Sequence, residues 1–456
     1  MLKTWEAVQK ILNKEGKENF IVKQLIINMK KIFHLTFLLI VSQLTSQQTP
    51  ASLSEESILF IGATAHIGNG TIIENSAIGI RNGKITEVTT KNLAEGEYDQ
   101  TIDVSDKHIY PGFIAANTSL GLVEIDAVRA SNDVDEIGDM LPHIRSIIAY
   151  NAESKIVESM RPNGVLVAQV APRGGFISGK SSIVQLDAWN WEDAVIRYDD
   201  GIHLNWPNPY TQGRWWLGES PDLKVNKKYA ENISKIEDFF KNAMARSVNK
   251  KPKNLPYYSL NQAIKKNKTI FLHANDEKQI VDGIVFLKNI GIKKIVLVGG
   301  RGLESQLNII TSNNIPVILS HPHRLPTNED EDLKLPFKLA SLLIGEGILV
   351  TIDVQGSMER MNTRNLPFYA GSFSAYGVEK EKAVEMITLN AAKILGIDDE
   401  MGSLEKGKDA TLFISKGDAL DMKTNIISRA FIQGREISLE SHQTELWKRY
   451  SEKYSK

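Results

Sequence analysis

The sequence contains no cysteine. This absence excludes three kinds of chemistry together: disulfide cross-links, zinc sites with thiolate ligands, and catalysis by a thiol nucleophile. It does not indicate a cellular compartment, because a chain without cysteine fits oxidising and reducing surroundings alike. Any catalytic or metal chemistry must therefore come from other side chains.

The sequence also has little net charge. Its 54 lysine and arginine residues stand against 55 aspartate and glutamate residues, so the formal net charge is −1. This balance gives no bulk electrostatic attraction to nucleic acid or to an anionic membrane. No internal repeat is visible. The 456 residues exceed what one compact core usually holds, and the ordinary 42% hydrophobic share predicts a globular protein of two domains.

The apolar run near the N-terminus is too short to span a bilayer, which takes about 20 residues. A short basic start at Met29–Lys31 precedes this run, 32–44, and small polar residues follow it. The order predicts a signal peptide over 29–47, with cleavage near Ser46–Gln48, and makes 1–28 an upstream extension of the gene model. We therefore expect an exported protein, periplasmic or extracellular. The alternative is an N-terminal amphipathic helix.

Residues 57–110 are predicted to form short strands joined by turns. The clearest signal is the segment 77–85, where Asn-Gly separates two apolar runs in the manner of a β-hairpin. Strand patterns return near the C-terminus, within 401–438. The simplest arrangement is a small β-sandwich domain built from both chain ends, followed by a polar helix over 439–456.

Between these ends, residues 111–400 alternate short apolar runs with helical patterns. The strand candidates are 164–170, 269–273, 294–298, 315–320 and 347–353, and the helical patterns include 278–289 and 336–346. This alternation predicts a parallel sheet. The span fits a barrel that typically takes about 250 residues. The predicted fold class is therefore α/β, a (β/α)8 TIM-like barrel inserted into the β-sandwich domain.

Two segments of the barrel region leave alternatives. The tryptophan-rich stretch 189–216 fits either a loop over the barrel mouth or a small satellite core beneath a loop. The stretch Gly174–Ser181 formally matches a phosphate-binding loop. Such a loop must lead into a helix, whereas 183–186 continues as a strand, so a glycine-rich turn between strands is the favoured interpretation.

Three motifs carry a resemblance to a known family. Residues 77–88 form a strand, an Asn-Gly turn and a Lys-Ile segment, and Pro111-Gly112-Phe113-Ile114 opens the barrel region. The most specific motifs are 388–396 and 402–410, which run through Thr-Leu-Asn-Ala-Ala-Lys and Gly-Ser-Leu-Glu-Lys-Gly-Lys-Asp-Ala. Over about 57–437 the chain resembles the amidohydrolase superfamily, especially its imidazolonepropionase-like bacterial members. Gly396 fits the left-handed end of a helix.

This resemblance implies one or two divalent metals at the carboxyl ends of the barrel strands, where a metal would acidify a water molecule. In the family, a His-x-His pair on the first strand supplies two ligands. The matching positions here hold Asn117 and Ser119, which are weak zinc ligands. The sixth-strand histidine is also missing, and Val298–Arg301 stands in its place. The usual metal site is therefore predicted to be degenerate.

The remaining expectations follow from the same resemblance and, for His321 and His323, from their spacing at the end of a predicted strand. His273 is the one retained metal ligand that we expect, on the fifth strand, and Asp353 is the expected catalytic carboxylate at the end of the eighth. Gln185 is a loose match for the fourth-strand lysine. We expect the following residues to contact substrate: Asn117, Ser119, Arg301, His321 and His323. The pair His321 and His323 has the i, i+2 spacing of two metal ligands, although Pro322 is typical of a loop.

Two functional hypotheses stay open. The first is a hydrolase of carbon–nitrogen bonds other than peptide bonds, with an atypical or reduced metal site that holds a divalent metal such as zinc, or none. The second is a catalytically inactive homologue that binds a ligand or regulates an active paralogue. The partners expected are a small-molecule substrate or ligand and either a homo-oligomer or such a paralogue, without nucleic acid or a stable membrane span.

Overall fold

The computed structural model describes residues 49–455 apart from 54, 95, 215–216, 221, 246–253, 327–330 and 357, together with positions 6, 10 and 14. The chain divides into two units, Met1–Thr49 and Pro50–Lys456. The predicted signal peptide, 29–47, lies outside the described residues. In the part of the chain that the structure describes, no helix has the length and apolarity needed to cross a membrane.

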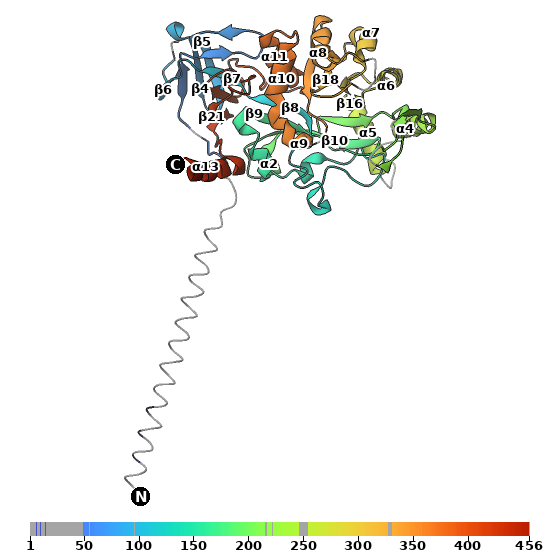
Figure 1. Ribbon diagram of the computed structural model, residues 1–456, viewed down its shortest axis with the longest axis horizontal. Coiled ribbons are helices and arrows are strands. Elements are labelled where there is room, and N and C mark those ends of the chain that lie inside the picture. Colours follow the sequence, from blue (N-terminus) through green and yellow to red (C-terminus); the bar gives the residue numbers. More distant parts are fainter. Residues whose placement is uncertain are drawn as a thin grey trace. The chain divides into compact units, whose positions relative to one another are not determined.

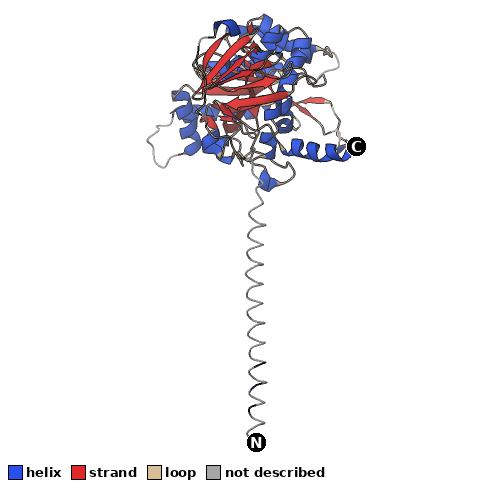
Figure 2. Ribbon diagram, turned by 90° about the vertical axis from the view of Figure 1, so that its left-hand side faces the viewer, coloured by secondary structure: helices blue, strands red, loops and turns tan. Residues whose placement is uncertain are grey.

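A curled 10-stranded sheet dominates the second unit (Figures 1 and 2), in the order β10-β13-β16-β17-β18-β19-β8-β9-β11-β12. From β13 to β9 in this order, every neighbouring pair is parallel. These parallel strands are β8 (Phe113–Thr118), β9 (Val165–Val170), β13 (Gly201–Asn205), β16 (Thr269–Ala274), β17 (Ile295–Gly299), β18 (Val317–Ser320) and β19 (Val350–Asp353). The α/β class and the parallel sheet are confirmed, and each strand predicted from an apolar run overlaps an observed strand.

One part of the sheet departs from a simple alternation of strand and helix. After β9 the chain turns back, so that β10 (Ile177–Lys180) runs antiparallel to β13 and β11 (Ser182–Gln185) runs antiparallel to β9. Gly174 and Gly175 have φ values of 82° and 58°, which allow this sharp turn before any crossover helix can form. The glycine-rich turn between strands is thereby confirmed in place of a phosphate-binding loop. A complete (β/α)8 barrel stays a prediction.

Helices lie against the outside of the curled sheet (Figure 2). The longer ones are α4 (Tyr229–Ala245), α5 (Leu255–Lys265), α6 (Glu277–Asn289), α7 (Leu307–Ser312), α8 (Leu335–Gly345), α10 (Leu366–Ala375), α11 (Lys380–Met386) and α12 (Leu389–Leu395), with short turns at α2 (Lys155–Glu158), α3 (Trp191–Ala194) and α9 (Glu359–Asn362). Their ends follow local signals: Asp276 and Gln279 form a capping box at α6. Pro336 lies in the first turn of α8, and Gly396 ends α12 at φ 71°.

The two chain ends share β-structure. One sheet has the order β5-β4-β1-β6 and the other β22-β21-β20-β7-β2-β3. Their strands are β1 (Ile58–Ile61), β2 (Thr64–His66), β3 (Ile72–Ile73), β4 (Ser76–Arg81), β5 (Lys84–Thr90), β6 (Gln100–Asp103), β7 (His108–Pro111), β20 (Leu412–Ser415), β21 (Ile427–Ile432) and β22 (Arg435–Glu436). The predicted Asn-Gly hairpin is confirmed, because Arg81 pairs with Lys84 across the turn. The polar helix α13 (His442–Tyr454) follows. The packing of these two sheets into a β-sandwich stays a prediction.

The remaining strands are short: β12 (Val195–Arg197) pairs with β11, and β14 (Tyr210–Gln212) pairs with β15 (Leu223–Val225). β12 and β14 lie within the tryptophan-rich stretch 189–216, whose tryptophan side chains differ in burial. Trp206 is buried in the main core and packs against Phe286 at 5.5 Å between ring centroids, whereas Trp189 is largely exposed. Trp215 and Trp216 lie outside the described residues.

Apolar side chains fill the space inside the curled sheet. They include Ile114, Val167, Phe271, Val296, Val298 and Ile318 from the strands and Ala391 and Ile394 from α12. The interior is therefore a packed core rather than a pore. Polar residues lie at the carboxyl ends of the strands, next to this apolar core. A functional site is expected at these strand ends.

Candidate functional site

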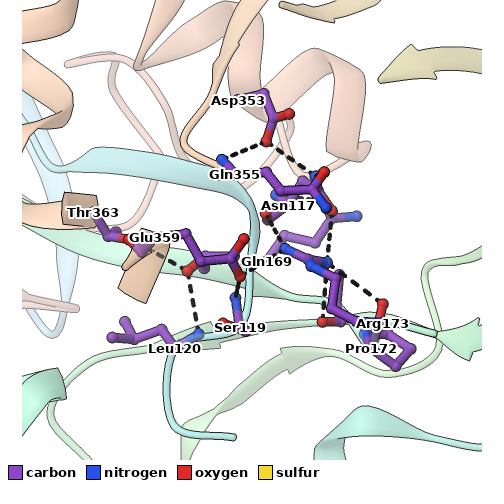
Figure 3. A network of polar contacts seen from close by, with 12 residues as sticks. Asn117, Ser119, Leu120, Gln169, Pro172, Arg173, Asp353, Gln355, Glu359 and Thr363 are labelled. Atoms are coloured by element: carbon purple, nitrogen blue, oxygen red, sulfur yellow. Dashed lines mark hydrogen bonds and ion pairs between the residues drawn. The ribbon is translucent and has the colours of Figure 1, made fainter. Parts of the chain in front are cut away.

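The structure brings Asn117 and Asp353 into contact at the carboxyl ends of two neighbouring strands. Ala116 of β8 pairs with Asp353, the last residue of β19. Asn117 then donates a hydrogen bond from Nδ2 to Asp353 Oδ1 at 3.0 Å (Figure 3). Two residues that are distant in the sequence thus share one end of the sheet, as the sequence analysis expected.

Every polar group of Asn117 is engaged. Its backbone nitrogen donates to Gln169 Oε1 at 3.0 Å, and its Oδ1 accepts from Arg173 Nη1 at 3.0 Å. Its φ of 49° lies in the left-handed region, which asparagine tolerates better than most residues. Because the amide oxygen and nitrogen have different partners, the orientation of this buried side chain is fixed.

Arg173 is the centre of the polar network in Figure 3. It follows β9 in the glycine-rich turn, and its side chain is only 16% exposed. Besides its bond to Asn117 Oδ1, Nη2 donates to the Asn117 carbonyl oxygen at 2.8 Å and to Glu359 Oε1 at 2.9 Å. Nη1 also reaches the carbonyl oxygens of Ala171 and Pro172 at 3.2 and 3.4 Å. Oxygen atoms therefore surround the guanidinium.

Glu359 closes the network from α9. Its Oε1 accepts from Arg173 and also from the backbone nitrogen of Ser119, the latter at 3.0 Å. Ser119 is buried, and it is its backbone nitrogen that binds Glu359. Asn117 and Ser119, which stand at the positions of the His-x-His pair in the family that the sequence resembles, thus hold an arginine and a glutamate in place.

Asp353 is almost completely buried, with 2% of its surface exposed. Its Oδ1 accepts from Asn117 Nδ2 and from the backbone nitrogen of Gln355 at 2.9 Å. Burial raises the pKa of Asp353 to about 6, although the Gln355 hydrogen bond, the charge of Arg173 and the Asn117 hydrogen bond each lower it. A carboxyl group with a pKa near neutrality can both accept and return a proton at physiological pH.

His273 on β16 contacts a second histidine that the sequence analysis did not single out. Its Nε2 lies 2.8 Å from Nδ1 of His203, which is on β13 and stacks on Phe271. Burial lowers the pKa of His273 to about 3, and the charge of Arg173 lowers it further, against a hydrogen bond with Gln355. Burial also holds the pKa of His203 well below its usual value. The two imidazoles are therefore neutral, and one donates to the other.

The carboxyl ends of the strands, where Asn117, Arg173, Asp353 and Glu359 meet, form the mouth of the curled sheet. A series of hydrogen bonds continues from Asn117 into the sheet. Gln169 of β9, which accepts from the Asn117 backbone, donates through Nε2 to Asp200 Oδ2 at 2.7 Å and to Ser181 Oγ at 3.2 Å. Burial raises the pKa of Asp200 to about 6. Its Oδ1 has no hydrogen-bond partner among the described residues. Two buried carboxyl groups are thus linked through Gln169 and Asn117.

The predicted residues Arg301, His321 and His323 lie on the loops that follow β17 and β18. The His321 backbone nitrogen donates to the Asp353 carbonyl oxygen at 3.0 Å, and its ring stacks on Tyr369 at 5.0 Å. Burial lowers the pKa of His321 to about 4, with His323 and Arg301 acting in the same direction. His323 instead turns to Ser372 Oγ at 3.0 Å. The two histidines therefore do not converge as a ligand pair.

The side chains at this mouth do not fit a divalent metal. In the described ranges, no group of three or more histidine, cysteine or acidic side chains could hold an ion. The Nε2 atom of His273 faces His203, and Glu359 Oε1 and Asp353 Oδ1 already accept hydrogen bonds. Gln185 lies on β11, not on the fourth strand, and there its Oε1 accepts from the backbone of Asp187. His273 as a metal ligand stays a prediction.

Four residues of the site were not predicted from the sequence: Arg173, Glu359, His203 and Gln355. Arg173 was visible only as the start of a glycine-rich turn, and the contact with Glu359 spans 186 positions in the sequence. His203 had a usable signal, since it lies in the short apolar run Gly201–Leu204. Because the acidic residues Asp199 and Asp200 come directly before this run, it was not recognised as a strand.

Comparison with known proteins points to one family. Residues 343–437 match the family model described as "Amidohydrolase family". A 5'-deoxyadenosine deaminase of Methanobrevibacter smithii is 22% identical over 366 residues, which cover 74% of this chain and 78% of that protein. A 5-methylthioadenosine/S-adenosylhomocysteine deaminase of Thermoanaerobacter pseudethanolicus is 24% identical over 372 residues, or 75% of this chain and 81% of the relative.

Solved structures agree on the fold. An amidohydrolase from Thermotoga maritima MSB8 superposes with a TM-score of 0.70 at 20% sequence identity, covering 83% of this chain and 99% of that one. A Xaa-Pro dipeptidase gives a TM-score of 0.51 at 12% identity, covering 83% and 99%. At these identities the likeness concerns the fold alone.

Proposed function

Because this chain is a member of the amidohydrolase superfamily, we propose that it is a hydrolase of carbon–nitrogen bonds other than peptide bonds, with its site at the mouth of the curled sheet. The family match and the deaminase relatives support the reaction class. The fold alone would not, since one fold hosts many activities. The position of the site is supported by the convergence of polar side chains at the carboxyl ends of parallel strands.

The observation that carries the proposal is the environment of Asp353. Its buried carboxyl group has a pKa of about 6, and Asn117 and the Gln355 backbone hold it in one orientation through Oδ1. Oδ2 is then the oxygen that exchanges a proton. A positioned acid–base group of this kind contributes typically about 10²–10⁴-fold to a rate.

The proposed reaction uses Asp353 as the catalytic residue. Oδ2 takes a proton from water while the water oxygen bonds to the substrate carbon. The protonated carboxyl group then gives that proton to the leaving nitrogen as the carbon–nitrogen bond breaks. The products are an amine or ammonia and the hydroxylated fragment. Because the side chains present do not fit a divalent ion, no step passes through one.

Other residues position the groups that react. Asn117 and Arg173 orient the carboxylate, so Asn117 acts as a positioning residue rather than as a direct substrate contact. Arg301 and His321 would contact the substrate from the loops beside Asp353. His321 Nδ1 is buried without a hydrogen-bond partner among the described residues, and its imidazole is neutral, so it can bond a polar substrate atom.

The barrel expected from the sequence completes this proposal. Only Ser181 separates β10 from β11, and these strands bond to β13 and β9 respectively. We propose that they act as one bent strand that closes the curled sheet into a barrel. Such closure would hold the strand ends that carry Asn117, His273 and Asp353 at fixed separations.

The test is a hydrolysis assay on the purified chain. Aminopurine nucleosides come first, because two of the relatives are named as deaminases of such compounds, followed by cyclic amides, ureas and amidines. Release of ammonia or amine should be saturable and should fall by at least about 100-fold in Asp353→Asn. Turnover that is unchanged in Asp353→Asn would refute the role of this carboxylate.

The replacement of the expected ligand pair by Asn117 and Ser119 favours a second candidate, an inactive homologue that binds a ligand or regulates an active paralogue. Stable co-purification with a His-x-His-bearing homologue, together with no turnover by the isolated chain, would support it. Robust turnover by the isolated chain would exclude it.

A further inference from the structure

The positive charge at the mouth is that of a side chain, the guanidinium of Arg173. Arg173 donates to oxygens from two other segments, the Asn117 carbonyl and amide oxygens beside β8 and the Glu359 carboxylate of α9. With 16% of its side chain exposed, it is a largely buried cation with a fixed geometry. A planar guanidinium binds carboxylate and carbonyl oxygens in defined directions, so this arrangement is specific for arginine.

Two carboxyl groups share the mouth with this cation. The negative charge of Glu359 raises the pKa of Asp353, whereas the positive charge of Arg173 lowers it. Burial makes an unpaired negative charge costly. The guanidinium therefore offsets the repulsion between the two carboxylates, as a bound metal ion would otherwise do.

We infer that Arg173 is the resident cation of the mouth, and that its guanidinium excludes divalent ions from the oxygens of Asn117, Asp353 and Glu359. The inference concerns the electrostatic design of this chain, and it holds whether or not the mouth turns over a substrate. It also assigns Arg173 as a positioning residue, since it contacts Asn117, which in turn binds Asp353.

Without the guanidinium, a metal ion could occupy its place. The oxygen atoms around that place determine which ion would bind. Removing the guanidinium would free the carbonyl and amide oxygens of Asn117 and the carboxylate of Glu359, beside the carboxyl group of Asp353. Carboxylate and amide oxygens suit hard cations such as Mn²⁺, Mg²⁺ and Ca²⁺ better than Zn²⁺. Mn²⁺ is therefore the probe of choice.

The experiment measures Mn²⁺ binding and thermal unfolding of the full chain, not activity. The wild type should show no one-to-one Mn²⁺ binding by calorimetry and no rise of Tm with Mn²⁺. Arg173→Met should bind one Mn²⁺, and its Tm should rise with Mn²⁺ concentration, because a ligand that binds only the folded state stabilises it. Arg173→Lys loses the directional contacts of the guanidinium but keeps a positive charge at the same place, so it should also gain no Mn²⁺ binding.

Arg161→Met is the matched control. Arg161 is also buried and pairs with a carboxylate, Asp187 Oδ1 at 3.1 Å, but not at the mouth. This variant should lose stability without gaining any response to Mn²⁺. A response in Arg161→Met equal to that of Arg173→Met would contradict the inference, since general loosening would then explain both.

Two further results would overturn the inference. One is a folded Arg173→Met that gains no Mn²⁺ binding. The other is one-to-one Mn²⁺ binding by the wild type that Asp353→Asn abolishes. If Arg173→Met does not fold, titrations of the wild type and Arg173→Lys decide alone: binding at Asp353 in either overturns the inference, and its absence in both supports it. The hydrolysis assay is independent, so failure of the proposed reaction leaves these outcomes unchanged.

Discussion

Arg173 binds Asn117 twice, through the backbone carbonyl oxygen at 2.8 Å and through the side-chain Oδ1 at 3.0 Å. This double contact ties the left-handed backbone of Asn117 to the orientation of its amide group. The amide nitrogen is consequently aimed at Asp353, and the proton affinity of that carboxyl group depends on both residues.

The pH dependence of kcat/KM should follow the ionisation of Asp353. If the ionised carboxylate accepts the proton from water, kcat/KM should rise with pH and level off above an apparent pKa of about 6. Asp353→Asn should lower kcat/KM by at least about 100-fold and abolish this limb of the profile. A pH profile for Asp353→Asn that still bends near 6 would assign the titration to another group.

Asn117→Ala should move that profile. The hydrogen bond from Nδ2 stabilises the ionised form of Asp353, so its removal raises the pKa of the carboxyl group further. The rising limb of kcat/KM should therefore shift to higher pH, with a smaller change in the plateau. Asn163→Ala serves as control, because Asn163 bonds the Arg364 carbonyl oxygen away from this network. A shift to lower pH in Asn117→Ala would refute the assigned contact.

Glu359→Gln should lower the free energy of unfolding by about 3 kcal/mol, because it leaves the buried guanidinium of Arg173 without its carboxylate. Urea unfolding followed by circular dichroism measures this change. Glu436→Gln, which removes the partner of Arg429 in an exposed pair, should cost less than about 1 kcal/mol. Equal losses in the two variants would show that the Arg173 pair is no stronger than a surface contact.

Asp200 should make stability depend on pH between its unfolded and folded pKa values. Its folded pKa is raised to about 6 from the ordinary 3.8, so the folded state binds more protons between these values. This contribution to stability is present at low pH and is lost as pH rises through about 6. Asp200→Asn should therefore stabilise the protein at pH 8 by up to about 3 kcal/mol relative to the wild type.

The matched measurement is the same urea titration at pH 4, where Asp200 is largely protonated in the folded state. The difference between Asp200→Asn and the wild type should shrink toward zero there. A constant difference at both pH values would mean that the substitution acts through packing rather than through the charge.

Export is testable directly. Expression of the full-length chain in a bacterium with an outer membrane should yield a shortened periplasmic or secreted protein that begins near Ser46–Gln48. N-terminal sequencing measures the cleavage site. Leu38→Arg, which places a charge in the apolar run, should leave the uncleaved form in the cytoplasm, while Lys14→Ala should change nothing.

The fold was largely predictable because its signals are local. Apolar runs such as 269–273 and 294–298 overlap β16 and β17, and the Asn-Gly turn gave the β4–β5 hairpin directly. The reversal after β9 was predictable only in part. The glycine-rich sequence indicated a turn, but it did not indicate that β10 would pair with β13 and β11 with β9. Periodicity reports which residues are buried, not which strands pair.

The site was less predictable, because its key contacts are long-range. The sequence marked Asn117, which follows the family motif at 111–114, and Asp353, which ends the strand predicted over 347–353. It gave no hint that Arg173 would turn toward Glu359, since that contact depends on where a short helix after β19 lies relative to a turn after β9. His321 and His323 had ligand spacing, yet His321 stacks on Tyr369, whereas His323 meets the same ring edge-on and bonds Ser372.

The pairing of β7 with β20 has a consequence for how this protein is made. Tyr110 and Phe413 face each other across these strands, so partners in one sheet are synthesised about 300 residues apart. Until the last part of the chain is available, β7 presents an open edge that can pair with other chains. Contacts of such sequence separation slow folding, so the nascent protein should remain unfolded for long periods. Chaperones that shield exposed strand edges should raise its yield. Early termination before β20, which leaves β7 without this partner, should cause aggregation rather than a smaller stable product.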